Sequence, residues 1–86
     1  MWYLYILKSL EKRWYYVGST NRLEERIKEH NTGKVTSTKS YKPLILVYKK
    51  EFDSEEEARG RERELKAKRI AKEEIIRHIE GHWEIV

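Results

Sequence analysis

The sequence predicts one small domain of the α/β (α+β) class over residues 1–86. Runs of aromatic and β-branched residues at the start and in the middle of the chain are typical of strands, and helix start and stop signals frame two other segments. The apolar start is too short to span a bilayer, so we expect no membrane association. The chain has no cysteine, which excludes disulfides and fits a reducing compartment, so we expect a cytoplasmic protein.

The first predicted element is a β-hairpin over residues 2–18, with a polar connection at residues 9–12. If this connection closes symmetrically, Tyr5 faces Tyr16 across the strand pair. Because side chains alternate across a sheet, the two phenols then share one face with a glycine. Ordinary cross-strand packing of aromatic residues is the alternative explanation for this arrangement. The residues expected on this face are Tyr3, Tyr5, Leu7, Trp14, Tyr16 and Gly18.

A helix is predicted over residues 21–32, because Asn21 has the position of an N-cap and Gly33 marks the far end. The helix positions i, i+3, i+4 and i+7 normally form a buried apolar stripe, but here Arg26 and His30 occupy two of these four positions. These two side chains then point at or beside the sheet. The stripe consists of Leu23, Arg26, Ile27 and His30.

Both polar residues of this helix also have a simpler explanation. The Arg26 guanidinium would lie in water over the sheet edge, paired with Glu29 or Glu25. His30 would end the helix as a cap that complements the helix dipole.

A basic loop and a third strand follow this helix. Residues 34–42 show no periodicity, whereas residues 43–48 are almost wholly apolar and predict a strand in the middle of the sheet or beneath two helices. All charged residues between positions 34 and 50 are lysines, and nearby hydroxyls suit phosphate oxygens. With 19 basic and 15 acidic residues, the chain carries a net charge of +4, which favours a nucleic-acid partner, although Lys/Glu-rich surfaces also serve solubility. The lysines are Lys34, Lys39, Lys42, Lys49 and Lys50, and the hydroxyls belong to Thr36, Ser37, Thr38 and Ser40.

A second helix is predicted to open at Ser54, which forms a capping box with Glu57. Its inward line runs from Ala58 through Glu62 to Leu65, so a carboxylate occupies the centre of a core-facing stripe. The alternative is a surface pair between Glu62 and a residue one turn away, Lys66.

From Ala67 the helix is predicted either to continue or to bend into a third helical segment, with Gly81 as its stop and a short tail after it. Its apolar face consists of Ala71, Ile75, Ile76 and Ile79.

The polar residues in these core-facing lines suit phosphodiester hydrolysis. The single carboxylate of Glu62 holds Mg²⁺ only loosely, so that water and a substrate phosphate complete its shell. Such an ion neutralises charge on a phosphodiester, Arg26 takes another phosphoryl oxygen, and a phenol receives the proton of the attacking water. A cation near that phenol must favour its phenolate, because the ordinary tyrosine pKa is about 10.

The motifs together resemble those of the GIY-YIG nuclease superfamily over residues 3–66. The paired signature matches Tyr3-Leu4-Tyr5 and Tyr16-Val17-Gly18, the arginine and histidine segment matches residues 23–31, and the alanine-to-glutamate step matches residues 58–62. The resemblance is closest to small single-domain bacterial members, which look like the catalytic modules of UvrC and of the Slx-type structure-selective endonucleases. The first motif departs from Gly-Ile-Tyr, Val17 replaces an isoleucine, and no equivalent of a distal asparagine follows Glu62.

The resemblance implies a small three-stranded antiparallel sheet flanked by helices and an endonuclease that cuts DNA with Mg²⁺ or Mn²⁺, with a link to DNA repair or recombination. It implies that Tyr5 or Tyr16 is the general base, with Tyr5 our first choice, and that Arg26 binds the phosphate. It further implies that His30 is a hydrogen-bonding or proton-shuttling partner and that Glu62 is the metal ligand.

Contacts to DNA are expected from Gly18, Lys34, Lys39 and Lys42. A partner protein could supply specificity. The main alternative is a non-catalytic nucleic-acid-binding or protein-interaction module with the same fold, and a purely structural domain is a third. Arg61 and Arg63 flank Glu62, where they would either assist substrate binding or pair with its carboxylate.

Overall fold

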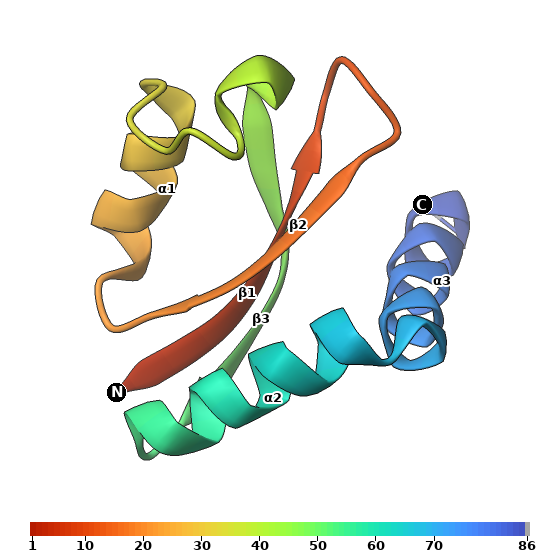
Figure 1. Ribbon diagram of the computed structural model, residues 1–86. Coiled ribbons are helices and arrows are strands. Elements are labelled where there is room, and N and C mark those ends of the chain that lie inside the picture. The colour runs from red at the N-terminus through yellow and green to blue at the C-terminus, as the bar shows by residue number, and fades with distance from the viewer. Residues whose placement is uncertain (86) are drawn as a thin grey trace.

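The structure, a computed structural model, describes residues 1–85, with side chains up to residue 80. A three-stranded antiparallel sheet in the order β2-β1-β3 is combined with three α-helices, which confirms the predicted fold class (Figure 1). The elements in chain order are β1 (Trp2–Ser9), β2 (Tyr15–Thr20), α1 (Leu23–Asn31), the 3₁₀ turn η1 (Lys39–Tyr41), β3 (Leu44–Phe52), α2 (Glu55–Ala67) and α3 (Arg69–Ile85). None of the described helices is long and apolar enough to cross a membrane.

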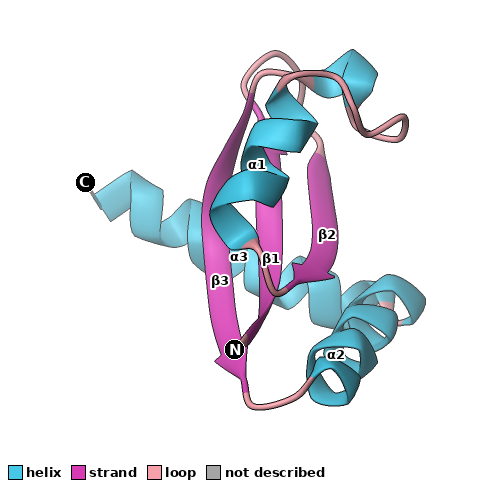
Figure 2. Cartoon of the chain, turned by 90° about the vertical axis from the view of Figure 1, so that its left-hand side faces the viewer, coloured by secondary structure: helices cyan, strands magenta, loops and turns pink. Residues whose placement is uncertain are grey.

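Helices cover both faces of the sheet, and the alternation of side chains along β1 and β2 divides the core between the two faces (Figure 2). One cluster includes Leu4, Ile6 and Val17 and packs against α2 and α3. The other is built on Tyr5 and Leu7 and packs against α1 and η1. The first cluster consists of Leu4, Ile6, Tyr15, Val17, Leu65 and Ile79, and the second consists of Tyr5, Leu7 and Leu44 with Trp14, Tyr16, Leu23, Ile27, Tyr41 and Leu46 around them.

The hairpin register differs from the prediction by two residues. Tyr5 lies opposite Gly18, and Leu7 lies opposite Tyr16, so the predicted pair of Tyr5 with Tyr16 is wrong. The connection is longer than predicted, because the Ser9 hydroxyl accepts hydrogen bonds from the backbone N–H groups of Glu11 and Lys12 and extends the turn. A shift by two residues keeps every side chain on its predicted face, so the two tyrosines do share one face.

The third strand is an edge strand and not the central one, which corrects one of the two predicted positions. It is also longer than predicted, because it continues through the lysines after residue 48, and it carries a bulge opposite Ile6 and Leu7. The Asn31 amide fixes its start, since Asn31 donates to the Leu44 carbonyl at 2.9 Å and accepts from the Leu44 N–H at 2.6 Å.

Of three predicted helix ends, one is wrong and two are confirmed. Asn21 is not the N-cap of α1: Arg22 has that position without a side-chain cap, and its N–H is bonded to the Thr20 hydroxyl. Gly33 does end α1, with a φ of 81° that favours glycine. Ser54 caps α2 through the Glu57 N–H as predicted.

The predicted stop at Gly81 is wrong, because α3 continues to Ile85. A single glycine in a helix costs only about 1 kcal/mol, which other residues of the helix can offset. The side chains of the predicted tail lie outside the described residues.

Candidate active site

The centre of the candidate site is a buried pair formed by a strand tyrosine and a helix histidine. The Tyr5 hydroxyl lies 2.9 Å from His30 Nε2, and neither residue is more than 1% exposed. Burial raises the pKa of the Tyr5 phenol to about 12, with Tyr16 adding to the shift and Arg26 opposing it. Burial and the positive charge of Arg26 lower the pKa of His30 to about 4. At neutral pH both side chains are therefore uncharged.

His30 does not act as the solvent-facing helix cap of the simpler explanation. Its second ring nitrogen, Nδ1, lies 2.8 Å from the hydroxyl of Thr38, which is fully buried. The prediction that Thr38 offers its hydroxyl to a phosphate is thus wrong, because the side chain turns inward from the loop. Both nitrogens of the buried imidazole have polar partners, as buried polar groups require.

Tyr16 lies beside this pair and remains half-buried. Its ring centroid is 6.3 Å from that of Tyr5 and 4.9 Å from that of His30. Gly18 makes this packing possible: a Cβ atom added there would lie 2.6 Å from the Tyr5 hydroxyl oxygen and 3.0 Å from the Tyr16 ring. Gly18 is buried against the Tyr5 phenol, a position that does not fit the predicted nucleic-acid contact at Gly18.

Arg26 reaches the same group of side chains from α1. Its guanidinium donates to Glu29 at 3.0 Å, which confirms the predicted ion pair, and it is close enough to Tyr5 to lower the phenol pKa. Glu29 is also the main cause of a raised Arg26 pKa. Arg26 therefore keeps its positive charge, and its half-buried side chain spans from the ion pair to Tyr5.

Glu62 lies at the edge of the sheet, beside β2. Its Oε1 accepts a hydrogen bond of 2.5 Å from the Ser19 hydroxyl, and its Oε2 is 2.7 Å from Lys66 Nζ. The predicted surface pair with Lys66 is therefore present, but Ser19 also fixes the carboxylate. Arg61 pairs with Glu64 and leaves Glu62 to these two partners.

The helices α1 and α2 cover opposite faces of the sheet. The Glu62 carboxylate on α2 nevertheless lies near Tyr16, across the edge strand β2. Lys66 links them, because its ammonium is 2.7 Å from Glu62 and 5.5 Å from the centroid of the Tyr16 ring. Glu62 also contributes to the raised pKa of Tyr5. The structure thus groups four of the five predicted catalytic residues, Tyr5, Tyr16, Arg26 and His30, on the α1 side of the sheet. The fifth, Glu62 on α2, is linked to this group through Lys66 at the β2 edge.

The Glu62 carboxylate is suited to bind a metal ion as its single protein ligand. Among the side chains that the structure describes, no three His, Cys, Asp or Glu residues form a metal-binding group. A dedicated protein cage is therefore absent from the described part, whereas Mg²⁺ often binds one carboxylate, waters and a substrate phosphate. Glu62 fits this second mode, and a cation at its Oε2 would replace the ammonium of Lys66.

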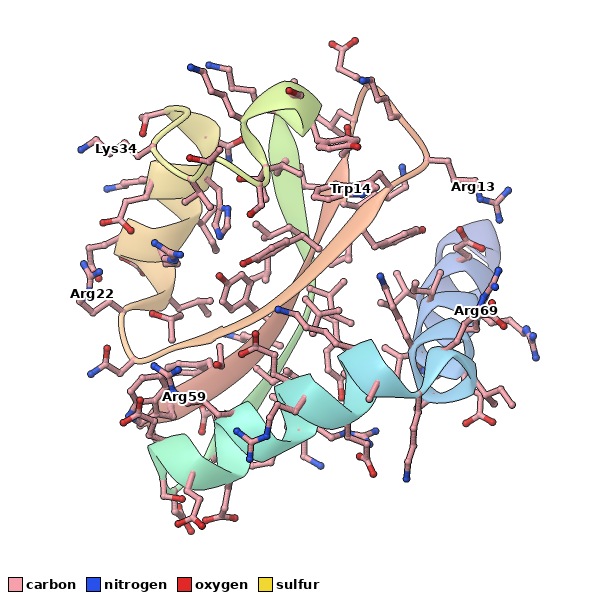
Figure 3. The ribbon with its side chains drawn as sticks, viewed as in Figure 1. Arg13, Trp14, Arg22, Lys34, Arg59 and Arg69 are labelled. Carbon is pink, nitrogen blue, oxygen red and sulfur yellow. The ribbon has the colours of Figure 1, made fainter. Side chains whose placement is uncertain are left out.

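Three predicted DNA-contacting lysines are exposed near the C-terminal end of α1. An added Cβ atom at Gly33 would lie 3.3 Å from Lys42 Nζ and 3.7 Å from Lys39 Cγ, so both side chains fold across this glycine. Lys34 follows directly after it. Figure 3 shows Arg22 and Lys34 beside the two ends of α1, on the side away from the sheet, and Arg59 on α2.

Two contacts of the site were not predicted from the sequence, that of Ser19 with Glu62 and that of Thr38 with His30. Strand alternation puts Ser19 on the face of β2 opposite Tyr16, and the position of α2 beside this edge strand brings the Ser19 hydroxyl to Glu62. Thr38 stands in a loop without periodicity, where no pattern separates an inward hydroxyl from an outward one.

Comparison with known proteins supports the resemblance found in the motifs. The model of one family, described as the GIY-YIG catalytic domain, matches residues 1–74. The chain is 43% identical over 65 residues to UPF0213 protein SH2523 of Staphylococcus haemolyticus, covering 74% of this chain and 78% of that protein. It is 36% identical over 75 residues to UPF0213 protein NP_0776A of Natronomonas pharaonis, covering 86% and 87%.

A solved structure agrees with these relatives. The solution NMR structure of UPF0213 protein BH0048 from Bacillus halodurans is 37% identical, has a TM-score of 0.55, and the match covers 88% of this chain and 83% of that one.

Proposed function

The chain belongs to the GIY-YIG family, whose members are generally endonucleases, and we propose that it hydrolyses DNA phosphodiester bonds with the help of a divalent metal ion. The observation that carries the proposal is the Tyr5–His30 pair next to Arg26, at the sheet edge where Glu62 lies. These residues combine a phosphate-binding cation, phenols and a single carboxylate. We further propose that the cut serves DNA repair or recombination and selects DNA by its structure.

Arg26 would bind a non-bridging oxygen of the scissile phosphate. Its ion pair with Glu29 fixes one side of the guanidinium and leaves other N–H groups for a phosphoryl oxygen. Such a contact stabilises the charge that develops in the transition state.

The two tyrosines receive different roles in this proposal. Tyr5 is almost fully buried, and burial raises its pKa to about 12, so it stays protonated and is poorly suited to remove a proton from water. This favours Tyr16 over our first choice. Tyr16 is half-buried, so an attacking water can reach its hydroxyl, and the Lys66 ammonium lies 5.5 Å from its ring centroid.

Glu62 would hold a Mg²⁺ or Mn²⁺ ion, with Ser19 keeping its carboxylate in place. When bound, the ion would neutralise charge on the phosphodiester and stabilise the leaving oxygen. Lys66 donates to the other carboxylate oxygen, Glu62 Oε2. If the ion bound at Oε2, the Lys66 ammonium would be displaced toward the DNA backbone.

The test measures cleavage of duplex, branched and single-stranded DNA by the purified protein in Mg²⁺ and in EDTA. We expect metal-dependent cleavage by the wild type. Glu62→Gln should abolish it while DNA affinity in EDTA holds or rises, because the variant loses a negative charge near phosphate. Tyr16→Phe should lower the rate by about 10² to 10⁴, and Tyr5→Phe by less.

Glu64→Gln is the matched control, because Glu64 lies on the same helix and pairs with Arg61. It should leave cleavage unchanged. If Glu62→Gln cuts DNA as fast as the wild type, the metal site assigned to Glu62 is wrong. Metal-independent DNA binding without cleavage by the wild type would instead favour the non-catalytic nucleic-acid-binding module.

A further inference from the structure

Three fully buried side chains form a continuous hydrogen-bond chain through the interior. The Tyr5 hydroxyl meets His30 Nε2 at 2.9 Å, and His30 Nδ1 meets the Thr38 hydroxyl at 2.8 Å. Thr38 in turn donates to the Val35 carbonyl at 3.3 Å. Each of the three side chains is at most 1% exposed. Water therefore does not compete for these bonds.

The last member of the chain determines the direction of the others. A backbone carbonyl only accepts hydrogen bonds, so a Thr38 hydroxyl that donates to Val35 accepts from His30 Nδ1. His30 then carries its proton on Nδ1. Because the ring is neutral at ordinary pH, its Nε2 is an acceptor, and Tyr5 must donate to it.

We propose that Thr38 is a positioning residue that fixes the tautomer of His30 and thereby turns the Tyr5 hydroxyl proton inward, away from Arg26. With its proton directed at His30, Tyr5 presents its oxygen lone pairs to the rest of the site, where Arg26 is its cationic neighbour. The opposite tautomer would make Nε2 a donor and turn the Tyr5 proton outward. That proton would then oppose the N–H groups of Arg26.

The catalytic part of this inference rests on the proposed nuclease function, whereas the tautomer itself does not. If the hydrogen bonds ran in the opposite direction, the outward Tyr5 proton would disturb the Arg26 guanidinium, which we assign to the scissile phosphate. Thr38 touches neither the phosphate nor the attacking water in this scheme, so it acts only through His30 and Tyr5.

The direct test is the ¹⁵N NMR spectrum of the imidazole nitrogens in the full-length protein at pH 7 without DNA. In the wild type, we expect His30 Nδ1 to carry the proton and Nε2 to be unprotonated. Thr38→Ser keeps the hydroxyl and should give the same spectrum. Thr38→Val has nearly the same shape but no acceptor for Nδ1–H, and it should shift His30 toward the Nε2-protonated form.

His78 is an exposed histidine on α3 and provides an internal reference whose signals should be the same in all three proteins. A wild-type spectrum with the proton on Nε2, or a Thr38→Val spectrum identical to the wild type, would overturn the proposal. The wild-type measurement decides even if Thr38→Val does not fold.

A cleavage assay of the same proteins separates the two proposals. Thr38→Val should cut DNA at least tenfold more slowly, and Thr38→Ser should restore the rate. If the wild type does not cut DNA at all, the proposed function fails while the tautomer assignment stands on its own spectrum. Equal cleavage by wild type and Thr38→Val would overturn the positioning role.

Discussion

At the scale of single residues, the buried His30 makes stability depend on pH. Its pKa is lowered to about 4 in the folded state, from an ordinary value of 6.5, first by burial and then by Arg26. Between these two values the unfolded chain binds a proton that the folded protein does not bind. The contribution of His30 to stability is therefore fully present above pH 6.5 and is lost as the pH falls toward 4.

This linkage predicts a loss of roughly 2 kcal/mol in the free energy of unfolding between pH 7 and pH 5, from about 1.4 kcal/mol per pKa unit. Urea denaturation at the two pH values measures it. His30→Gln should lose that part of the pH dependence, whereas the exposed control His78→Gln should keep it. A His30→Gln variant with the same dependence as the wild type would show that the ring is not held uncharged.

Gly18 gives a second prediction at this scale. Gly18→Ala should destabilise the protein by about 1 to 3 kcal/mol, because its Cβ atom would lie 2.6 Å from the Tyr5 hydroxyl oxygen in a filled core. Gly60→Ala is the matched control, since its Cβ atom would be 3.9 Å from the flexible end of Arg63. In a helix interior that change should stabilise the protein by up to about 1 kcal/mol. Thermal unfolding compares them, and a neutral Gly18→Ala would contradict the packing argument.

The candidate catalytic residues stand out in the sequence more clearly than the residues that contact them. Arg26, His30 and Glu62 each interrupt an apolar helical stripe, and such an interruption is visible without coordinates. Ser19 and Thr38 interrupt no pattern, because hydroxyl residues are common in edge strands and loops. Their roles depend on contacts between segments that are distant in sequence.

At the scale of elements, the basic loop between α1 and β3 gives a prediction about DNA affinity. Lys39 and Lys42 fold across Gly33, next to the end of α1 that carries His30. Replacing both by alanine should reduce the slope of log affinity against log salt by up to about 1.8, from about 0.9 per phosphate contact on duplex DNA. Binding titrations in EDTA at several salt concentrations measure the slope without cleavage.

The control removes two positive charges elsewhere, at Lys68 and Lys72 near the start of α3. That double alanine variant should keep the wild-type slope. If both double variants flatten the slope equally, the loop contributes only net charge and is not itself at the interface.

The three strands and three α-helices were predicted correctly, whereas the hairpin register, one alternative for the place of β3 and the end of α3 were not, and the 3₁₀ turn η1 lies in a segment predicted as a loop. The observed hairpin register differs from the predicted one by two residues because Ser9 stabilises a longer turn. A shift by two residues leaves the alternation of apolar and polar side chains unchanged, so the sequence pattern does not reveal it. The third strand is almost wholly apolar although it lies at an edge, because helices cover both of its faces. The predicted stop at Gly81 is wrong because the cost of one glycine in a helix is small enough for the other residues of α3 to offset.

At the scale of the whole molecule, the sheet separates two tasks. The face of β1 and β2 with Tyr5 and Tyr16 packs against α1 and carries the candidate site. The face with Leu4, Ile6 and Val17 packs against α2 and α3 and supplies an apolar core. Among the described side chains, Glu62 and its partners at the β2 edge link the two sides. Stability of the second face should therefore be adjustable with little change at the site.

Ile79 on α3 tests this separation, because it is 5% exposed and belongs to the core cluster of the second face. Ile79→Ala should lower the free energy of unfolding by about 2 to 5 kcal/mol. Ile70→Ala on the same helix should change it by at most about 0.5 kcal/mol, because Ile70 is 72% exposed. Below its melting temperature, Ile79→Ala should keep wild-type DNA affinity in EDTA. Unchanged stability would show that α3 does not complete the core, and lost affinity in the folded variant would show that the two faces are coupled.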